Sequence, residues 1–339
     1  MKLIKPSFEI IEQQPGLAGV YKQIELAGRT CYKSEDKITE DSAKGFVDRM
    51  IASGHGAMLE HGTVYLKIIG VFLDPTDCDV DYGHYVVSHY TKNKYSKVII
   101  KHDEDWKSDV YITTNLRVLV ENGWMDDLKY ICEPTEYHEK RVCVRFICDR
   151  GVSHEFVRHR VFSFAQESTR YCNYSKDKFG NEITCIIPCW MNLEEGSYNN
   201  GKYYNPIATP YLVKGTAEER FLLKLVGDEL DYFELLEKGW KPQQARAILP
   251  NSLKTELVMT GFVSDWWGKT NIIKDNKLIQ SISNSSPNLE AETGKYDASY
   301  RIVRNGFFGL RCAPSAHPQA QELAIPLREE FIKRKYLSE

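Results

Sequence analysis

The 339-residue sequence lacks the features that define several large classes of protein. It has no run of about 18 apolar residues, so it predicts no membrane-spanning helix. Its first residues, MKLIKPSFEIIEQQPG, alternate charged side chains with short apolar pairs and lack the apolar run of a signal peptide. We therefore expect a soluble, cytoplasmic protein with no membrane partner.

An excess of positive charge is also lacking. Lysine and arginine total 44 against 47 acidic residues, which gives a net charge of -3. No overall basic field is therefore available to hold nucleic acid, and we expect no nucleic-acid partner. Positive charge in this protein must act locally.

Cysteine pairs with the spacing of common metal or redox motifs are missing. The nine cysteines are an odd number and include no CxxC pair, which suits reduced thiols better than a disulfide framework. Cys185 and Cys189 have a spacing compatible with zinc, but no second pair accompanies them. We expect no metal.

Four familiar catalytic signatures are absent. The sequence contains no GxxxxGK[ST], no GxGxxG after a strand, no HExxH and no GxSxG. P-loop ATP hydrolysis, Rossmann-type cofactor binding, zincin chemistry and α/β-hydrolase chemistry are therefore not expected.

Apolar periodicity predicts interspersed strands and helices. Strands, or apolar β-branched runs, are expected over 64–68, 85–90, 97–100 and 141–151. Helices are expected over 41–54, 115–123, 152–160, 216–239, 241–250, 252–267 and 317–335, the last bent at Pro326. Residues 268–305 are rich in Asn and Ser and predict an insertion or a mobile loop. The absence of a regular βαβ rhythm favours one α/β or α+β domain over residues 1–339.

The segment RHRVFSFAQESTRY, from Arg158 to Tyr171, concentrates positive charge and hydrogen-bond donors. Arginine is a permanently charged, planar donor that suits phosphate or carboxylate oxygens. Consecutive helical residues point about 100° apart, so the RHR triplet cannot converge on one small ion. It can contact separate parts of one large ligand, or two ligands. The alternative is a solvated cationic turn paired with Glu155 and Glu167.

The spacing RHR, seven residues, serine, one residue, arginine resembles the signature of the flavin-dependent thymidylate synthase family. Further segments resemble that family in order along the chain, and two of them resemble its long-chain branch. They are LEHGTVYL, NLR (115–117), RFICDRGVSHEFVRHR, PQQARAILPNSLKTELVMT and the closing LRCAPSAHPQAQELA. The resemblance implies a central, largely antiparallel sheet flanked by helices, interrupted by insertions at about 73–140 and 268–305. It also implies a homotetramer.

The resemblance also implies roles for individual residues. Those expected to contact FAD are His61, Arg158, His159, Arg160 and Gln166. Those expected to hold dUMP, through side chain or backbone, are Glu155, Arg158, Gln166, Glu167, Ser168, Thr169, Arg170, Arg246 and Arg311. Arg311 is the expected catalytic residue, because a fixed charge beside the uracil ring would stabilise negative charge at N3 and the neighbouring carbonyl oxygen. Ser168 is expected to bind the ligand; covalent catalysis by its hydroxyl is the alternative.

Five positions in four segments depart from the family pattern. Phe262 and Ser264 replace an asparagine and an arginine, and Gly306 replaces a polar residue, all three at expected flavin contacts. Cys31 stands where a serine is common. Gln166 stands where many members have glutamate. These changes affect the flavin more than the nucleotide.

The resemblance implies a methyltransferase that makes dTMP from dUMP. Methylenetetrahydrofolate would donate the carbon, FAD would carry hydride and NADPH would be the reductant. The altered flavin contacts leave two alternatives open. One is a flavin-dependent enzyme that makes a C5-hydroxymethylated pyrimidine nucleotide, and the other is a catalytically idle homologue that binds a nucleotide or nucleic acid.

Overall fold

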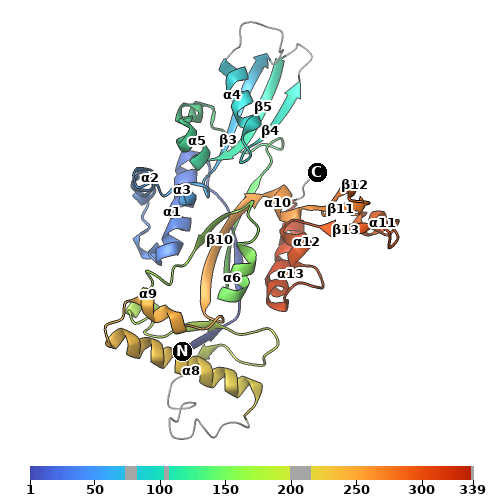
Figure 1. The fold of residues 1–339 in the computed structure, drawn as a ribbon. Helices are drawn as coiled ribbons and strands as arrows, with labels where there is room; N and C mark the ends of the chain where they lie inside the picture. Colours follow the sequence, from blue (N-terminus) through green and yellow to red (C-terminus); the bar gives the residue numbers. More distant parts are fainter. Residues whose placement is uncertain (73–81, 103–106, 199–214, 337–339) are drawn as a thin grey trace.

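The computed structural model describes residues 1–72, 82–102, 107–198 and 215–336 (Figure 1). Within these ranges, no helix combines the length and the apolar character needed to cross a bilayer. The described elements form four sheets with helices packed around them.

A four-stranded antiparallel sheet lies at the centre of the fold. Its strands are β2 (Ser7–Ile11), β6 (Arg141–Asp149), β10 (Lys254–Phe262) and β7 (Ser163–Gln166), in that spatial order. All three pairings are antiparallel, and Thr260 of β10 faces Cys143 on one side and Ser163 on the other. This confirms the expected mixed α/β fold with a largely antiparallel central sheet.

Helices cover both faces of the central sheet, and β10 is therefore buried on both sides. Helix α1 (Gly16–Tyr32) covers the face that carries Val258 and Cys143. The opposite face, with Leu257 and Met259, packs against helices from three later segments. These are α6 (Arg150–Phe156), α12 (Phe307–Arg311) and α13 (Pro318–Lys333).

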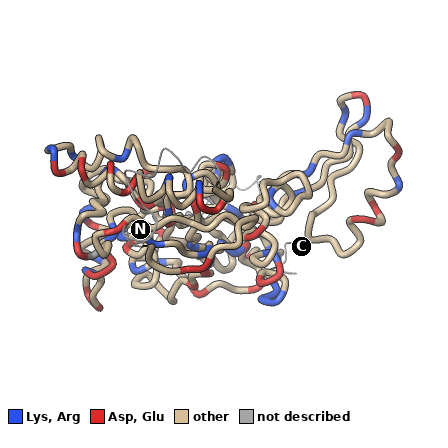
Figure 2. The backbone as a smooth tube through the Cα atoms, turned by 90° about the horizontal axis from the view of Figure 1, so that it is seen from below, with Lys and Arg blue, Asp and Glu red and all other residues tan. Residues whose placement is uncertain are grey.

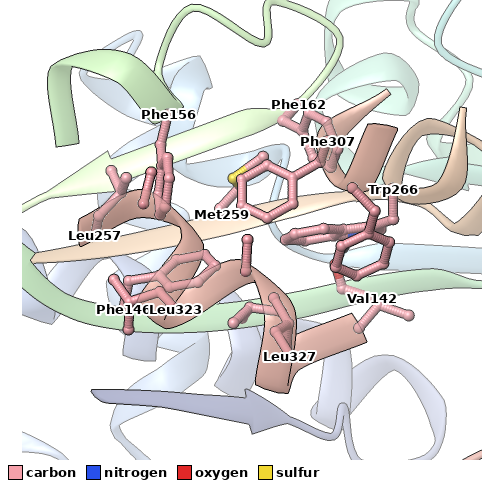
Figure 3. Close-up of a cluster of buried hydrophobic side chains, with 14 of the residues drawn as sticks. Val142, Phe146, Phe156, Phe162, Leu257, Met259, Trp266, Phe307, Leu323 and Leu327 are labelled. Carbon is pink, nitrogen blue, oxygen red and sulfur yellow. Dashed lines mark hydrogen bonds between the residues drawn. The ribbon is translucent and has the colours of Figure 1, made fainter. Parts of the chain in front are cut away.

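The core on this second face is aromatic. The indole ring of Trp266 lies 4.8 Å from the ring of Phe162 and 5.0 Å from that of Phe307, measured between centroids (Figure 3). Phe331 of α13 closes the cluster at 5.3 Å from Trp266. Chain segments more than 150 residues apart meet here. This core therefore joins the C-terminal helices to the segment from Arg158 to Tyr171, called the motif segment below.

The second sheet and its helices form a lobe with its own core. The strands are β3 (Thr63–Phe72), β5 (Lys107–Asn115) and β4 (Lys97–His102), in the spatial order β3-β5-β4. The helical segments are α2 (Ser42–Ala52), α3 (Gly56–Leu59), α4 (Tyr82–Lys92), α5 (Leu116–Asn122) and the 3-10 turn η2 (Met125–Tyr130). The described part of the expected insertion at 73–140 thus adds to a sheet that begins before it.

A third sheet and a long helix lie at the opposite end of the molecule (Figure 1). The sheet contains β8 (Thr184–Ile186), β1 (Lys2–Ile4) and β9 (Gly196–Ser197). Helix α8 (Ala217–Glu237) begins with the predicted capping box, in which Thr216 and Glu219 bond each other's backbone N–H groups. The short helix α9 (Pro242–Ala245) and the turn η5 (Arg246–Ile248) follow it.

Residues 268–305 fold into an arm, so the expectation of a mobile loop is wrong. The arm is a three-stranded antiparallel sheet of β11 (Lys269–Lys274), β12 (Lys277–Ser283) and β13 (Arg301–Arg304), with the short helix α11 (Leu289–Thr293). Figure 2 shows it projecting from the body, with positive and negative residues interspersed over the described part of the chain. Its strands are short and mostly polar, so the alternation of apolar and polar residues that identifies a strand is weak in the sequence.

Two further predictions are wrong. Residues 85–90 belong to helix α4 and not to a strand, because Val86, Val87 and Tyr90 share the buried face of a helix. The helix expected over 252–267 is strand β10 followed by the short helix α10 (Val263–Trp267). A strand buried on both faces is apolar at nearly every position, so its period does not separate it from a buried helix.

The remaining predictions of local structure hold, with small shifts of boundary. Helices occur at 42–52, 116–122, 217–237 and 318–333, the last containing Pro326, and strands cover 64–68, 97–100 and 141–149. Helix α6 ends at Phe156, so the prediction that this helix continues to Arg160 is wrong, and the RHR triplet lies in the turn after the helix. No observation tests whether residues 1–339 form one domain, and that stays a prediction.

Truncation of the aromatic core should destabilise the whole fold. Phe331 is 0% exposed and the next residue, Ile332, is 52% exposed on the same helix. We expect Phe331→Ala to lower the free energy of unfolding by about 3–5 kcal/mol because it leaves a cavity. The control Ile332→Ala should change it by roughly 0.5 kcal/mol or less. Urea unfolding measures both, and equal effects would contradict this assignment of the core.

Candidate functional site

Helix α6 is fixed at its start by a buried carboxylate, which places the RHR triplet that follows it. Asp149 caps the helix by accepting the backbone N–H of Val152 at 2.8 Å, and its other oxygen accepts from Gln319 of α13 at 2.8 Å. Burial raises the pKa of Asp149. The turn after α6 then leads into β7, so the motif segment is held at both ends.

Three of the predicted site residues meet in one cluster. Arg311, at the end of α12, donates to the carboxylate of Glu155 at 2.6 Å, to the carbonyl oxygen of Glu155 at 2.6 Å and to His159 Nε2 at 3.0 Å. The side chain of Arg311 is only 15% exposed. Burial and the Arg311 charge lower the pKa of His159 to about 4. His159 is therefore neutral near pH 7, with Nε2 as an acceptor.

A second cluster gathers around the serine of the motif. Arg246 Nη1 donates to Thr169 Oγ1 at 3.2 Å, and Arg170 Nε donates to Gln243 at 3.2 Å. Arg170 and Arg246 are both exposed. The fold thus brings the PQQAR segment beside the motif segment, as the predicted nucleotide role of both requires.

Ser168 lies in this second cluster, held through its backbone. Its N–H donates to the Cys31 carbonyl oxygen at 3.0 Å, and its hydroxyl accepts the Arg170 N–H at 3.3 Å. Within the described residues, no histidine or carboxylate is hydrogen-bonded to this hydroxyl. A nucleophilic serine needs such a base, so the geometry favours the ligand-binding role.

The arginines of the RHR triplet are not neutralised by the glutamates near them. Arg158 and Arg160 are exposed, and neither forms an ion pair within the described part of the chain. Glu155 pairs with Arg311, and Glu167 pairs with Lys254 at 2.7 Å. The pairing with Glu155 and Glu167 that the alternative of a cationic turn assumed is therefore wrong, whereas the solvent exposure that it assumed for Arg158 and Arg160 is present.

A row of buried charged side chains links Glu167 of the motif segment to β10 and to the end of α1. Lys254 bridges Glu167 and Glu256 at 2.7 Å each, and Lys33 also binds Glu256. The side chains of Glu167 and Lys254 are 2% and 14% exposed. Lys254 and Glu256 were not singled out from the sequence. Their spacing of two residues would have placed them on one face if 254–262 had been predicted as a strand.

His61 lies on the other face of the sheet from the Arg311 cluster. It is fully buried, and its Nδ1 is hydrogen-bonded to Thr260 Oγ1 at 2.8 Å. Burial and the charge of Arg141 lower its pKa to about 3. No hydrogen bond among the described residues joins His61 to the RHR triplet. Its flavin role stays a prediction.

The five positions that depart from the family pattern have structural surroundings of their own. Gly306 has φ of +77°, and a Cβ there would lie 2.4 Å from the Gly268 Cα, at the base of the arm. Phe262 is buried, and the guanidinium carbon of Arg141 lies 5.5 Å from the centroid of its ring. Ser264 donates to Glu139. None of these three positions offers an open side-chain donor for a ligand.

The other two departures are packed or bonded within the chain. Cys31 Sγ lies 3.9 Å from Met58 Sδ, and burial raises the pKa of the Cys31 thiol to about 11. Gln166 donates to Ser153 at 2.8 Å and to Thr255 at 3.3 Å. The described residues hold no group of three His, Cys, Asp or Glu side chains arranged for a metal ion.

Comparison with known proteins points to one family. Residues 137–269 match the family model described as thymidylate synthase complementing protein. A flavin-dependent thymidylate synthase of Corynebacterium aurimucosum is 23% identical over 251 residues, covering 72% of this chain and 63% of that protein. The enzyme of the same name from Pyrococcus abyssi is 30% identical over 190 residues, covering 56% and 53%.

The chain is thus similar to flavin-dependent thymidylate synthases over part of its length. It spans less than two thirds of the length of these relatives. A structure of the UMP/dUMP methylase PolB from Streptomyces cacaoi aligns over 98% of this chain and 92% of that chain. The two sequences are 12% identical in this alignment, and its TM-score is 0.36. Membership of the long-chain branch of the family stays a prediction.

The depressed pKa of His159 should make stability depend on pH. The unfolded histidine has a pKa of about 6.5, so below that pH the unfolded chain binds a proton that the folded chain binds only near pH 4. The contribution of neutral His159 to the free energy of unfolding is therefore fully present above about pH 6.5 and is lost as the pH falls toward 4.

We test this with His159→Gln, which keeps an acceptor for Arg311. Between about pH 7.5 and pH 5, wild type should lose about 2 kcal/mol more unfolding free energy than the variant. Urea unfolding at the two pH values measures the difference, and equal losses would contradict the assignment. His61, unchanged in both proteins, cancels in the comparison.

Removal of the central lysine from the row of buried charges should be costly. Lys254→Met leaves Glu167 and Glu256 without their shared partner, and we expect unfolding free energy to fall by about 3–5 kcal/mol. The control Lys44→Met removes a lysine that is 73% exposed in its pair with Asp48, which is itself 55% exposed. That control should cost little stability. Similar losses in both variants would show that Lys254 is not part of a buried network.

Proposed function

We propose that this protein is a methyltransferase that converts dUMP to dTMP. Methylenetetrahydrofolate supplies the carbon, NADPH is the reductant, and the enzyme acts as a homotetramer in the cytoplasm. The observation that supports this most is the pair of clusters around Glu155–His159–Arg311 and Thr169–Arg170–Arg246, assembled from segments that the family shares. Similarity to the family supplies the reaction, and the clusters supply the groups for a nucleotide.

The phosphate of dUMP would bind at the second cluster. Arg170 and Arg246 present exposed guanidinium groups beside Thr169, and the Ser168 hydroxyl lies in the same turn. Each charge-assisted hydrogen bond to a phosphate dianion contributes roughly 1.5–3 kcal/mol. The backbone of Glu167 is fixed to β10 by a 2.8 Å bond to Glu256, which holds this turn in place. Phosphate binding therefore needs little rearrangement.

The uracil ring would lie near Arg311. A guanidinium beside N3 and the carbonyl oxygen stabilises negative charge that develops there, and this raises electron density at C5, the atom that attacks the carbon donor. Glu155 and His159 orient the guanidinium through three hydrogen bonds. Because His159 is neutral near pH 7, it accepts from Arg311 without adding a second positive charge.

The residues fit the phosphates of FAD better than its ring. Arg158 and Arg160 are exposed and have no ion-pair partner among the described residues, which suits a pyrophosphate. The expected ring contacts at Phe262, Ser264 and Gly306 offer no open donor, and His61 is buried. FAD would carry hydride between NADPH and the transferred carbon.

A second candidate function follows from the same loss of ring contacts. If the flavin is poorly placed for hydride transfer, water adds to the transferred carbon instead of hydride. The product is then a C5-hydroxymethylated nucleotide. A third outcome is an idle homologue that binds dUMP without turnover, but retention of Arg311 in a held geometry argues against it.

The product distinguishes these functions. The purified protein is incubated with dUMP, methylenetetrahydrofolate, FAD and NADPH, and the nucleotides are identified by mass spectrometry. We expect dTMP, with NADPH oxidation that depends on dUMP. A hydroxymethylated product would support the second candidate, and binding of dUMP without any product would support the idle homologue.

Loss of Arg170 should weaken nucleotide binding specifically. We expect Arg170→Ala to raise the KM for dUMP about 10- to 100-fold, because one charge-assisted contact to the phosphate is lost. The control Arg145→Ala removes an arginine that pairs with Glu9 on β2 instead. That variant should keep the wild-type KM. An unchanged KM in Arg170→Ala would remove Arg170 from the phosphate site.

A further inference from the structure

The side chain of Gln166 is connected to both arginine clusters of the candidate site. Gln166 ends β7, and Ser168 of the second cluster follows shortly after it in the chain. Its partner on β10 is Leu257, and paired residues of neighbouring strands point to the same face of a sheet. That face is covered by α6, which also carries Glu155, the partner of Arg311. Gln166 therefore lies on the face of the Arg311 cluster and beside the second cluster in the chain.

Ser153 of α6 fixes the orientation of the Gln166 amide. The side chain of Ser153 is fully buried, and its hydroxyl donates to the Arg150 carbonyl oxygen at 2.8 Å. A hydroxyl has a single hydrogen, so Ser153 Oγ can only accept any further hydrogen bond. It accepts one from Gln166 Nε2 at 2.8 Å. The amide nitrogen of Gln166, and not its oxygen, therefore faces α6.

Thr255 of β10 is a second acceptor for the same nitrogen. Its side chain is also buried, and its Oγ1 accepts from Gln166 Nε2 at 3.3 Å. An amide nitrogen carries two hydrogens, so these two contacts use both. The Cys31 thiol interacts with the backbone of Gln166 and not with its side chain. No hydrogen bond among the described residues reaches Gln166 Oε1, so the half-buried side chain presents an acceptor and no donor.

The chemistry of dUMP offers two donors for this acceptor. They are the N3–H of the uracil ring and the 3′-hydroxyl of the deoxyribose, since a phosphate dianion only accepts. With the ring near Arg311 and the phosphate at Arg170 and Arg246, the sugar lies between the two clusters. Gln166 is connected to both clusters, so its acceptor meets the sugar.

We propose that Ser153 and Thr255 are positioning residues that hold Gln166 as an acceptor for the 3′-hydroxyl of the nucleotide. The inference rests on the proposed function, which places a deoxynucleotide across the two clusters. A carboxylate at position 166 would need no such support, because both of its oxygens accept hydrogen bonds. The amide needs it, because only one of its two orientations turns an acceptor toward the sugar.

The test compares two ligands by calorimetric titration of the full-length protein. They are dUMP and 2′,3′-dideoxyuridine 5′-monophosphate, which lacks only the 3′-hydroxyl. We expect wild type to bind dUMP about tenfold more tightly, which is the contribution of one hydrogen bond. The readout is the ratio of the two dissociation constants, because a general loss of stability weakens the binding of both ligands alike.

Ser153→Ala frees the amide of Gln166 to turn, and we expect it to reduce the ratio to about twofold or less. The control Ser96→Ala removes another buried serine hydroxyl, which is bonded to Thr114 Oγ1 at 2.9 Å in the other lobe. That control should keep the wild-type ratio. Thr255→Val removes the second acceptor without a change of shape and should also lower the ratio, so it serves if Ser153→Ala does not fold.

Gln166→Glu separates positioning from a merely structural role of Ser153. Either oxygen of the carboxylate accepts, so the ratio in Gln166→Glu should stay high and should not change when Ser153→Ala is added. A ratio that falls in this double variant as it does in Ser153→Ala alone would overturn the positioning role.

Three other results would overturn the inference. A wild-type ratio near one would show that Gln166 does not meet the 3′-hydroxyl. An unchanged ratio in both Ser153→Ala and Thr255→Val would show that neither residue positions the amide, while dUMP binding and the proposed function stand. Failure of wild type to bind dUMP at all would instead remove the proposed function, and the inference with it.

Discussion

The pairing of β10 between β6 and β7 is the constraint on which the rest of this structure depends. One face of β10 carries the aromatic core that holds α12, and with it Arg311, against the motif segment. The other face carries Glu256, which belongs to the row of buried charges, and Thr260, which fixes His61. A shift of register by one residue would exchange these faces, so the two arginine clusters and the row of charges exist only in this pairing.

The protein uses charged side chains in two ways, one buried and one exposed, and the difference locates its candidate sites. Glu167, Lys254, Glu256 and Lys33 neutralise one another and hold the motif segment, which is a structural use of charge. Arg158, Arg160, Arg170 and Arg246 remain exposed and without carboxylate partners in the described residues. In a protein of net charge -3, such arginines are the groups free to bind an anionic ligand.

Much of this arrangement could be predicted from the sequence where the signal is local. The capping box at Thr216 marks the start of α8, and the motif segment predicts which residues gather in the two arginine clusters. Strand β10 was predicted as a helix because burial on both faces removes the alternation that identifies a strand. The contacts of Arg311 with Glu155 and of Lys254 with Glu167 could not be predicted, since each joins positions distant in the chain and depends on tertiary packing.

The central claim is that the segment from Glu155 to Arg170, with Arg246 and Arg311, recognises a deoxynucleotide through its phosphate. Calorimetric titration of the wild-type protein with dUMP and with deoxyuridine tests it directly, since the two ligands differ only in the phosphate. The account predicts that dUMP binds at least about tenfold more tightly, which is the contribution of one charge-assisted contact. Equal affinities, or binding of neither ligand, would contradict it.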